Sequence, residues 1–201
     1  MELQKINVKV FVAEPDQVPL TAFIDIFHSW IQATDGVYYD VADYSHMRAG
    51  PGILLIAHEA NVSIDETGGR RGLLYNRKQT LQGSNAEKLR SVFRSALEYC
   101  RRIEAEPTLR GKIKFLGNEA LFVINDRLLA PNGDETFYAV RADLEDLARS
   151  LYGGAAFTLD YEIDPGKRFS VTIRAPVAFD IGTLLKNLEE QSKEAGRRLV
   201  S

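Results

Sequence analysis

The chain has 201 residues, of which 45% are hydrophobic and 26% charged, and its formal net charge is −3. This near-average composition excludes a disordered chain, a collagen-like fibre and a coiled-coil rod. The acidic balance argues against a surface built to cover phosphate backbones, because such surfaces carry clustered positive charge. At this length we expect one globular domain over residues 1–201, with internal halves 1–107 and 111–201 as a further division.

The apolar residues and the single cysteine indicate where in the cell the protein is expected. No apolar stretch reaches the ~18 residues that a membrane span needs, so we expect no membrane partner. Residues 1–5 lack the apolar core of a secretory signal, which favours a cytoplasmic protein. The single cysteine, Cys100, can form neither an internal disulfide nor a thiolate cage. We expect neither a metal centre nor a cofactor.

The N-terminal third is expected to begin with a strand and a helix. In residues 5–14 apolar side chains recur at every second position, which is typical of a strand with one buried face. Residues 20–31 carry apolar side chains at helical spacing, and Asp35-Gly36 is a typical helix end. Residues 38–47 are expected to be extended, although their alternation is weak.

The middle of the chain carries the clearest strand pattern. Residues 53–65 are expected to form one strand, apolar on both faces at its start and on one face later. The glycines that follow permit a turn, so residues 73–78 are expected to return as the partner strand. Ser84 and Glu87 have the spacing of a capping box, which predicts that a long helix begins there.

The same order of strands and helix is expected twice more. The predicted elements are strands 119–130 and 136–141 with a short helix after Asp143, then strands 156–164 and 168–174 with a helix from Asp180 to Gly196. These three units suggest internal repetition, in which Arg77 would match Arg141; an unrelated series of hairpins is the alternative. The predicted fold class is α+β: an antiparallel sheet of successive hairpins with about four helices packed on it, in two ferredoxin-like or helix-grip-like halves.

His58 is the first candidate functional residue. In the predicted strand 53–65 it shares a face with Ile56 and Ala60, so it is expected to point into the core or a pocket. In a pocket, the imidazole could act as a general acid or base near neutral pH. The alternative is a buried neutral histidine, for which His58→Ala would cost about 2–3 kcal/mol of stability. His58-Glu59 begins like the zinc motif H-E-x-x-H, but the second histidine is absent.

A second group of candidates lies on the segment 38–47. Asp40, Tyr44 and His46 would share one face of it and could line a polar ligand pocket, or bind a metal with help from elsewhere. The alternative is an edge strand or loop with solvated polar groups. If this segment lies beside the strand that carries His58, the four residues could together form one site.

The predicted long helix has a basic outer face. This face, which could bind nucleic acid or another anionic ligand, carries Lys88, Arg90, Arg94, Arg101 and Arg102. However, Arg94, Glu98 and Arg102 follow one another at a spacing of four residues, which is typical of a solvated helix. We therefore do not expect nucleic acid as a partner.

No motif in the sequence indicates a particular reaction. There is no phosphate-binding loop, nucleophile elbow, Cys-x-x-Cys pair or dinucleotide-binding glycine motif. The leading hypothesis is a non-catalytic cytoplasmic domain of bacterial type that forms a homodimer or another homo-oligomer, or binds a small molecule; dimerisation can cover the edge strands of a hairpin sheet. The alternatives are an enzyme with a pocket near His46 and His58, and an anion-binding protein that uses Arg90, Arg94 and Arg101.

Overall fold

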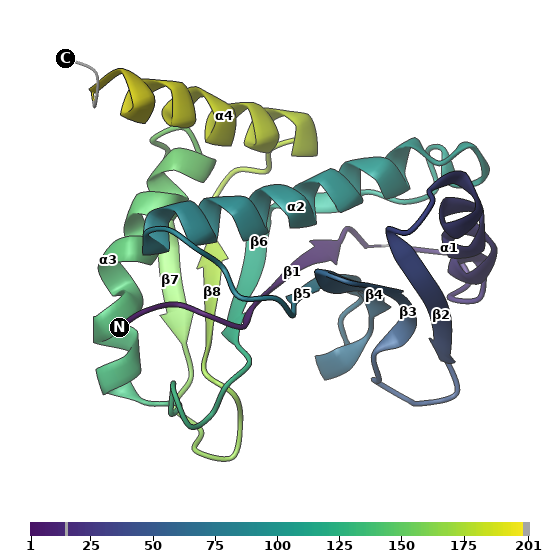
Figure 1. Cartoon of the computed structure of the whole chain (residues 1–201), viewed down its shortest axis with the longest axis horizontal. Coiled ribbons are helices and arrows are strands. Elements are labelled where there is room, and N and C mark those ends of the chain that lie inside the picture. Colours follow the sequence, from purple (N-terminus) through teal and green to yellow (C-terminus); the bar gives the residue numbers. More distant parts are fainter. Residues whose placement is uncertain (15, 199–201) are drawn as a thin grey trace.

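The computed structural model describes residues 1–14 and 16–198, with side chains as far as residue 190. Within them one antiparallel sheet of eight strands has the order β2-β3-β4-β5-β1-β6-β8-β7 (Figure 1). The strands are β1 (Ile6–Val12), β2 (Tyr38–Tyr44), β3 (Gly52–Ala57), β4 (Ala60–Asp65), β5 (Gly72–Arg77), β6 (Phe115–Ile124), β7 (Thr158–Tyr161) and β8 (Ser170–Arg174). The helices are α1 (Ala22–Ala33), α2 (Asn85–Ala105), α3 (Asp134–Leu151) and α4 (Ile181–Arg198).

The predicted α+β class, with an antiparallel sheet and four helices, is confirmed. The ferredoxin-like or helix-grip-like halves are not confirmed, because a single sheet takes strands from both sides of residue 107. The join is β1, which pairs with β5 on one side and with β6 on the other. All seven residues of β1 are buried, as expected for a central strand.

All four helices pack on the same face of the sheet. The capping box of α2 is present as predicted: the Ser84 hydroxyl accepts a hydrogen bond from the Glu87 backbone N–H, and the Glu87 carboxylate accepts one from that of Ser84. The apolar stripe of α2 lies over β1 and β5, and α1 lies over β2 and β3. In the other half, the ring of Phe137 on α3 stacks on Tyr161 of β7 with a centroid distance of 3.9 Å.

The opposite face of the sheet has no helix over it in residues 1–14 and 16–198. Half-buried Leu54, Leu74 and Leu121 lie on this open face. Beside them, Lys9 of β1 and Asp65 of β4 form a buried ion pair, with 2.6 Å between Nζ and Oδ1. Burial lowers the pKa of the Lys9 ammonium, an effect that the adjacent Asp65 carboxylate opposes.

The prediction of a hairpin from strands 119–130 and 136–141 is wrong. Residues 136–141 lie inside the long helix α3 and do not form a strand. Their Thr, Phe, Tyr and Val residues have high strand propensity, but Phe137, Val140 and Leu144 are all buried at helical spacing. Arg141 is therefore helical whereas Arg77 lies on a strand, and the alignment that suggested internal repetition loses its middle unit.

Two predicted boundaries also differ from the structure. The expected single strand 53–65 is the hairpin β3–β4, because the chain bends at His58 and Glu59. This bend contains neither glycine nor proline, and the Glu59 carbonyl is held by the backbone N–H groups of Lys78 and Gln79 at 2.9 and 3.2 Å. At the C-terminal end, α4 continues through Gly196 to Arg198.

The buried ion pair on the open face can be tested by substitution. Lys9→Met leaves the Asp65 carboxylate buried without a counter-charge, so we expect a loss of about 3–5 kcal/mol in the free energy of unfolding. The matched control is Lys5→Met, because the Lys5 side chain is 58% exposed in its ion pair with Asp126 and should contribute less than about 1 kcal/mol. Urea denaturation at neutral pH measures both; equal effects would contradict this account.

Candidate ligand pocket

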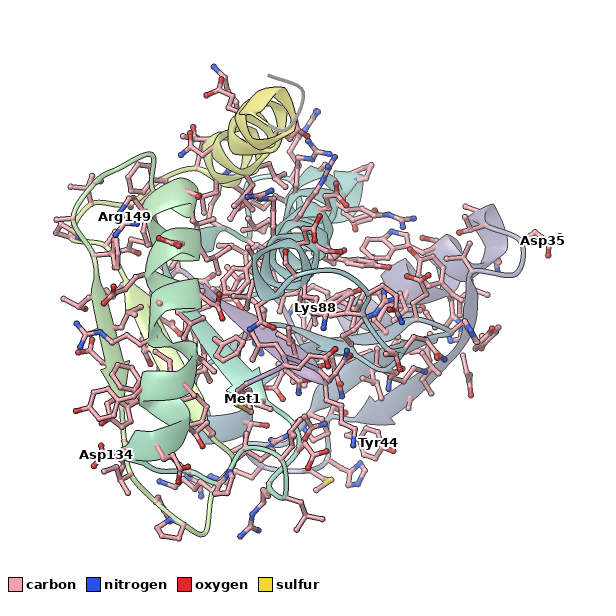
Figure 2. All side chains as sticks on the ribbon, turned by 60° about the vertical axis from the view of Figure 1, so that its left-hand side comes forward. Met1, Asp35, Tyr44, Lys88, Asp134 and Arg149 are labelled. Atoms are coloured by element: carbon pink, nitrogen blue, oxygen red, sulfur yellow. The ribbon has the colours of Figure 1, made fainter. Side chains whose placement is uncertain are left out.

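The structure does not bring the four sequence-predicted site residues together. Asp40 and Tyr44 are exposed on the edge strand β2, and Figure 2 shows Tyr44 on the outside of the molecule. His46 follows the end of β2, with its ring centroid 6.4 Å from that of Tyr44. His58 lies at the other end of the β2–β3 hairpin, because Tyr44 pairs with Gly52 whereas Tyr38 pairs with Ala57. The length of β3, ~20 Å, therefore separates the two histidines.

Of the two positions predicted for His58, the one in the core is wrong. The buried side chains of β3 are Ile53, Leu55 and Ala57, and the bend that follows leaves His58 exposed. An alternation argument fails here because it assumes that the strand continues past residue 57.

His58 is therefore expected to contribute little to stability. We expect His58→Ala to change the free energy of unfolding by less than about 0.5 kcal/mol, because the side chain is exposed and fills no space in the core. Ile53→Ala is the comparison, since Ile53 is fully buried on the same strand and its truncation should cost about 2–5 kcal/mol. Chemical denaturation measures both variants; a loss near 2 kcal/mol for His58→Ala would restore the core interpretation.

His58 does border a cavity of about 510 Å³, the size of a small-molecule site. We call it the tyrosine pocket. It lies between the β3–β4 bend, the start of β2, β5 and one side of α2. Its lining comprises Gly36, Val37, Tyr38, Ala57, His58, Glu59, Ala60, Tyr75, Ser95, Glu98, Tyr99 and Arg102.

The local sequence explains how α2 supplies one wall of this pocket. Ser95, Glu98, Tyr99 and Arg102 are three, four and seven residues apart, so they share one side of the helix. This side flanks the buried stripe that holds α2 on the sheet, and Tyr75 of β5 faces it with its ring centroid 6.1 Å from that of Tyr99. The sequence carries a partial signal for this wall, because Ser95, Tyr99 and Arg102 have helical spacing. It does not show that this side of α2 faces Tyr38 of β2 and Tyr75 of β5, which depends on how the helix packs on the sheet.

Polar groups from β2 and α2 converge in the pocket. The hydroxyl oxygens of Tyr38 and Tyr99 are 3.2 Å apart, and Nη1 of Arg102 donates a hydrogen bond of 2.9 Å to the Tyr38 hydroxyl. The Arg102 guanidinium lies 3.7 Å above the Trp30 ring, which fixes its plane. Burial raises the pKa of Tyr99, and its bond with Tyr38 acts in the same direction, so the phenol stays neutral.

The charges around the pocket are paired, with one exception. Glu98 binds Arg94 at 3.0 Å and Glu59 binds Arg77 at 2.7 Å. Arg102 has no carboxylate partner among residues 1–14 and 16–190; its contacts there are with Tyr38 and Trp30. One guanidinium is therefore without a counter-charge at the wall of a cavity, which is an arrangement that can attract an anion.

A larger cavity of about 910 Å³ lies between α1 and the segment after α2. Its lining mixes apolar side chains, such as Val18 and Leu109, with polar ones such as Lys112. The carboxylate of Glu106, which also borders it, already accepts a hydrogen bond from the indole N–H of Trp30. Because fewer polar groups converge there, we take the tyrosine pocket as the candidate site.

The basic face predicted for α2 is only partly formed. Lys88 does not belong to it: the side chain is 1% exposed and its ammonium binds the Glu2 carboxylate at 2.7 Å. Arg94 is held between Glu98 and Glu189, at 3.0 and 3.2 Å. Arg90 is half-buried and Arg101 is exposed. This distribution offers no continuous row of free positive charges for a phosphate backbone.

Comparisons with known proteins add no constraint: no family model, curated protein or solved structure matches this chain. In the part of the chain that the structure describes, no cluster of histidine, cysteine and carboxylate side chains has a geometry that could hold a metal ion. The described helices include none with both the length and the apolar character of a membrane span.

Proposed function

We propose that this chain is a non-catalytic cytoplasmic protein that binds a small molecule in the tyrosine pocket. The observation that carries the proposal is the meeting of the Tyr38 hydroxyl, the Tyr99 hydroxyl and the Arg102 guanidinium at one cavity of about 510 Å³. Polar groups that converge in a cavity with some apolar lining are typical of a small-molecule site.

The same pocket offers little support for the rival hypothesis of an enzyme. A catalytic imidazole is normally oriented by a carboxylate and placed beside a nucleophile. Across the described side chains His58 has no such carboxylate, since the neighbouring Glu59 is bonded to Arg77. His46, the other residue of that hypothesis, lies at the opposite end of β3. We therefore assign His58 to the border of a binding site.

Binding in the tyrosine pocket can be tested with a panel of small carboxylates, amines and neutral aromatic compounds by saturation-transfer NMR. The blocking variant is Ser95→Trp, which would place an indole in the cavity from the half-buried position 95. The matched control is Ser91→Trp, one turn earlier on the same side of α2, at an exposed position that does not line the pocket. We expect at least one compound to bind the natural chain and the control but not the blocked variant.

Two results would contradict the proposed function. Failure of every compound to bind the natural chain would remove the basis for a small-molecule site. Equal binding to the Ser95→Trp variant would place the site elsewhere on the molecule. Circular dichroism of both tryptophan variants checks whether the fold is retained.

The open face of the sheet favours a second proposed function, self-association of two copies. Half-buried aliphatic side chains lie on that face, and β2 and β7 are edge strands whose outer backbone groups have no strand partner in the described residues. A second copy could cover such a face or edge, which is how many antiparallel sheets avoid uncontrolled association.

Self-association predicts a concentration-dependent mass. In sedimentation velocity across micromolar concentrations, we expect the natural chain to form a dimer and Leu54→Lys, on the open face, to remain monomeric, because burying an unpaired ammonium is costly. Val177→Lys is the control, since Val177 is 63% exposed in the connection between β8 and α4. A natural chain that stays monomeric throughout would exclude this function.

A further inference from the structure

We propose that the tyrosine pocket selects small molecules that carry a negatively charged oxygen group, and that Arg102 with the Tyr38–Tyr99 pair binds that group. This inference rests on the proposed function and specifies its ligand class. It is carried by the geometry of the donors, the pairing of the surrounding charges and the shape of the cavity.

The hydrogen bonds within the pocket leave donors free. Tyr38 and Tyr99 bring two O–H protons, and their contact at 3.2 Å uses only one, whichever hydroxyl donates. One phenolic proton is therefore available to a ligand. Arg102 has five N–H donors, of which Nη1 uses one on the Tyr38 hydroxyl. The pocket thus presents unused donors to whatever occupies it, and an acceptor-rich group satisfies them best.

The charges around the donors favour an anion over a neutral acceptor. Glu98 and Glu59 border the pocket, but each already binds an arginine: Glu98 binds Arg94, which Glu189 shares, and Glu59 binds Arg77. Arg102 is therefore the one charged group of the lining that has no oppositely charged partner among the described side chains. A carboxylate or phosphate would supply the missing counter-charge and could accept two parallel N–H bonds from the guanidinium.

Arg102 is held in place before a ligand arrives. Its guanidinium stacks on the Trp30 ring at 3.7 Å, and the Trp30 indole N–H is bonded to Glu106. The guanidinium therefore keeps its plane through stacking and presents N–H groups along its edge. A donor that is already oriented loses less entropy on binding, which raises affinity.

The other lining residues indicate which uncharged groups of a ligand would fit the pocket. Val37, Ala57 and Ala60 contribute small apolar surfaces, and Tyr75 contributes an aromatic ring. A cavity of about 510 Å³ accommodates a compact molecule and excludes a polymer. The ligand class is a small organic acid with an apolar or aromatic body, and benzoate is a suitable probe.

Charge selectivity can be tested with probes of one shape. Benzoate, benzamide and benzylammonium share an aromatic body but differ in charge, and phenyl phosphate tests the other anionic group. In saturation-transfer NMR titrations, we expect an anionic probe to bind the natural chain about tenfold more tightly than benzamide, with benzylammonium weakest. The better of benzoate and phenyl phosphate identifies the anion; equal affinity for benzamide and both anions would overturn the proposal.

Substitutions then assign the selectivity to Arg102. Arg102→Met keeps an aliphatic chain against Trp30 without the charge, and we expect it to weaken binding of the better anion about tenfold or more while changing benzamide by less than about twofold. Arg101→Met is the control, because this exposed neighbour removes the same net charge outside the pocket. An equal loss in both variants would show a general charge effect and overturn the assignment.

Two more conservative variants test the same assignment with smaller changes to the side chain. Arg102→Lys retains the charge without the planar fork and should bind the anion with intermediate affinity, and Tyr99→Phe removes a donor and should weaken it less than Arg102→Met does. Thermal unfolding shows whether each variant is folded. A pocket that binds only neutral compounds would overturn the anion proposal and leave the proposed function intact, whereas a pocket that binds none would remove both.

Discussion

The pairing of β1 with both β5 and β6 is the interaction on which the rest of the structure depends. It joins a five-strand group, β2-β3-β4-β5-β1, to the remaining three strands and makes one sheet. A strand in this position is buried on both faces, so Ile6, Val8 and Val10 meet the helices while Asn7, Lys9 and Phe11 are buried on the other side. The buried charge of Lys9 is tolerated only because Asp65 lies two strands away on the same face.

This central pairing also fixes the position of α2, and through it the tyrosine pocket. The apolar stripe of α2 packs over β1 and β5, which turns the neighbouring side of the helix toward β2 and the β3–β4 bend. Tyr99 and Arg102 lie on that side and meet Tyr38, which is 61 residues from Tyr99 in the sequence. The candidate site is a consequence of how one long helix sits on the sheet.

The basic residues of α2 show how packing separates similar side chains into different roles. Lys88 is buried and paired with Glu2, Arg94 is exposed and shared by two glutamates, and Arg102 stacks on Trp30 without a carboxylate. In the sequence all three are positive charges on one predicted helix. Their surroundings decide whether the charge stabilises the fold, remains solvated or is available to a ligand.

The sequence by itself determined the fold class, the hairpins β4–β5 and β7–β8, and the start of α2. The reason is that strand alternation, glycine turns and the Ser84–Glu87 capping box all depend on residues that are close together along the chain. Only the tertiary structure decided that residues 136–141 are helical, where burial at helical spacing outweighs strand propensity. The tertiary structure also placed His58 in a bend and brought Tyr38, Tyr99 and Arg102 together. Contacts across 60 residues or more depend on how strands pair and where helices pack, and no local pattern encodes them.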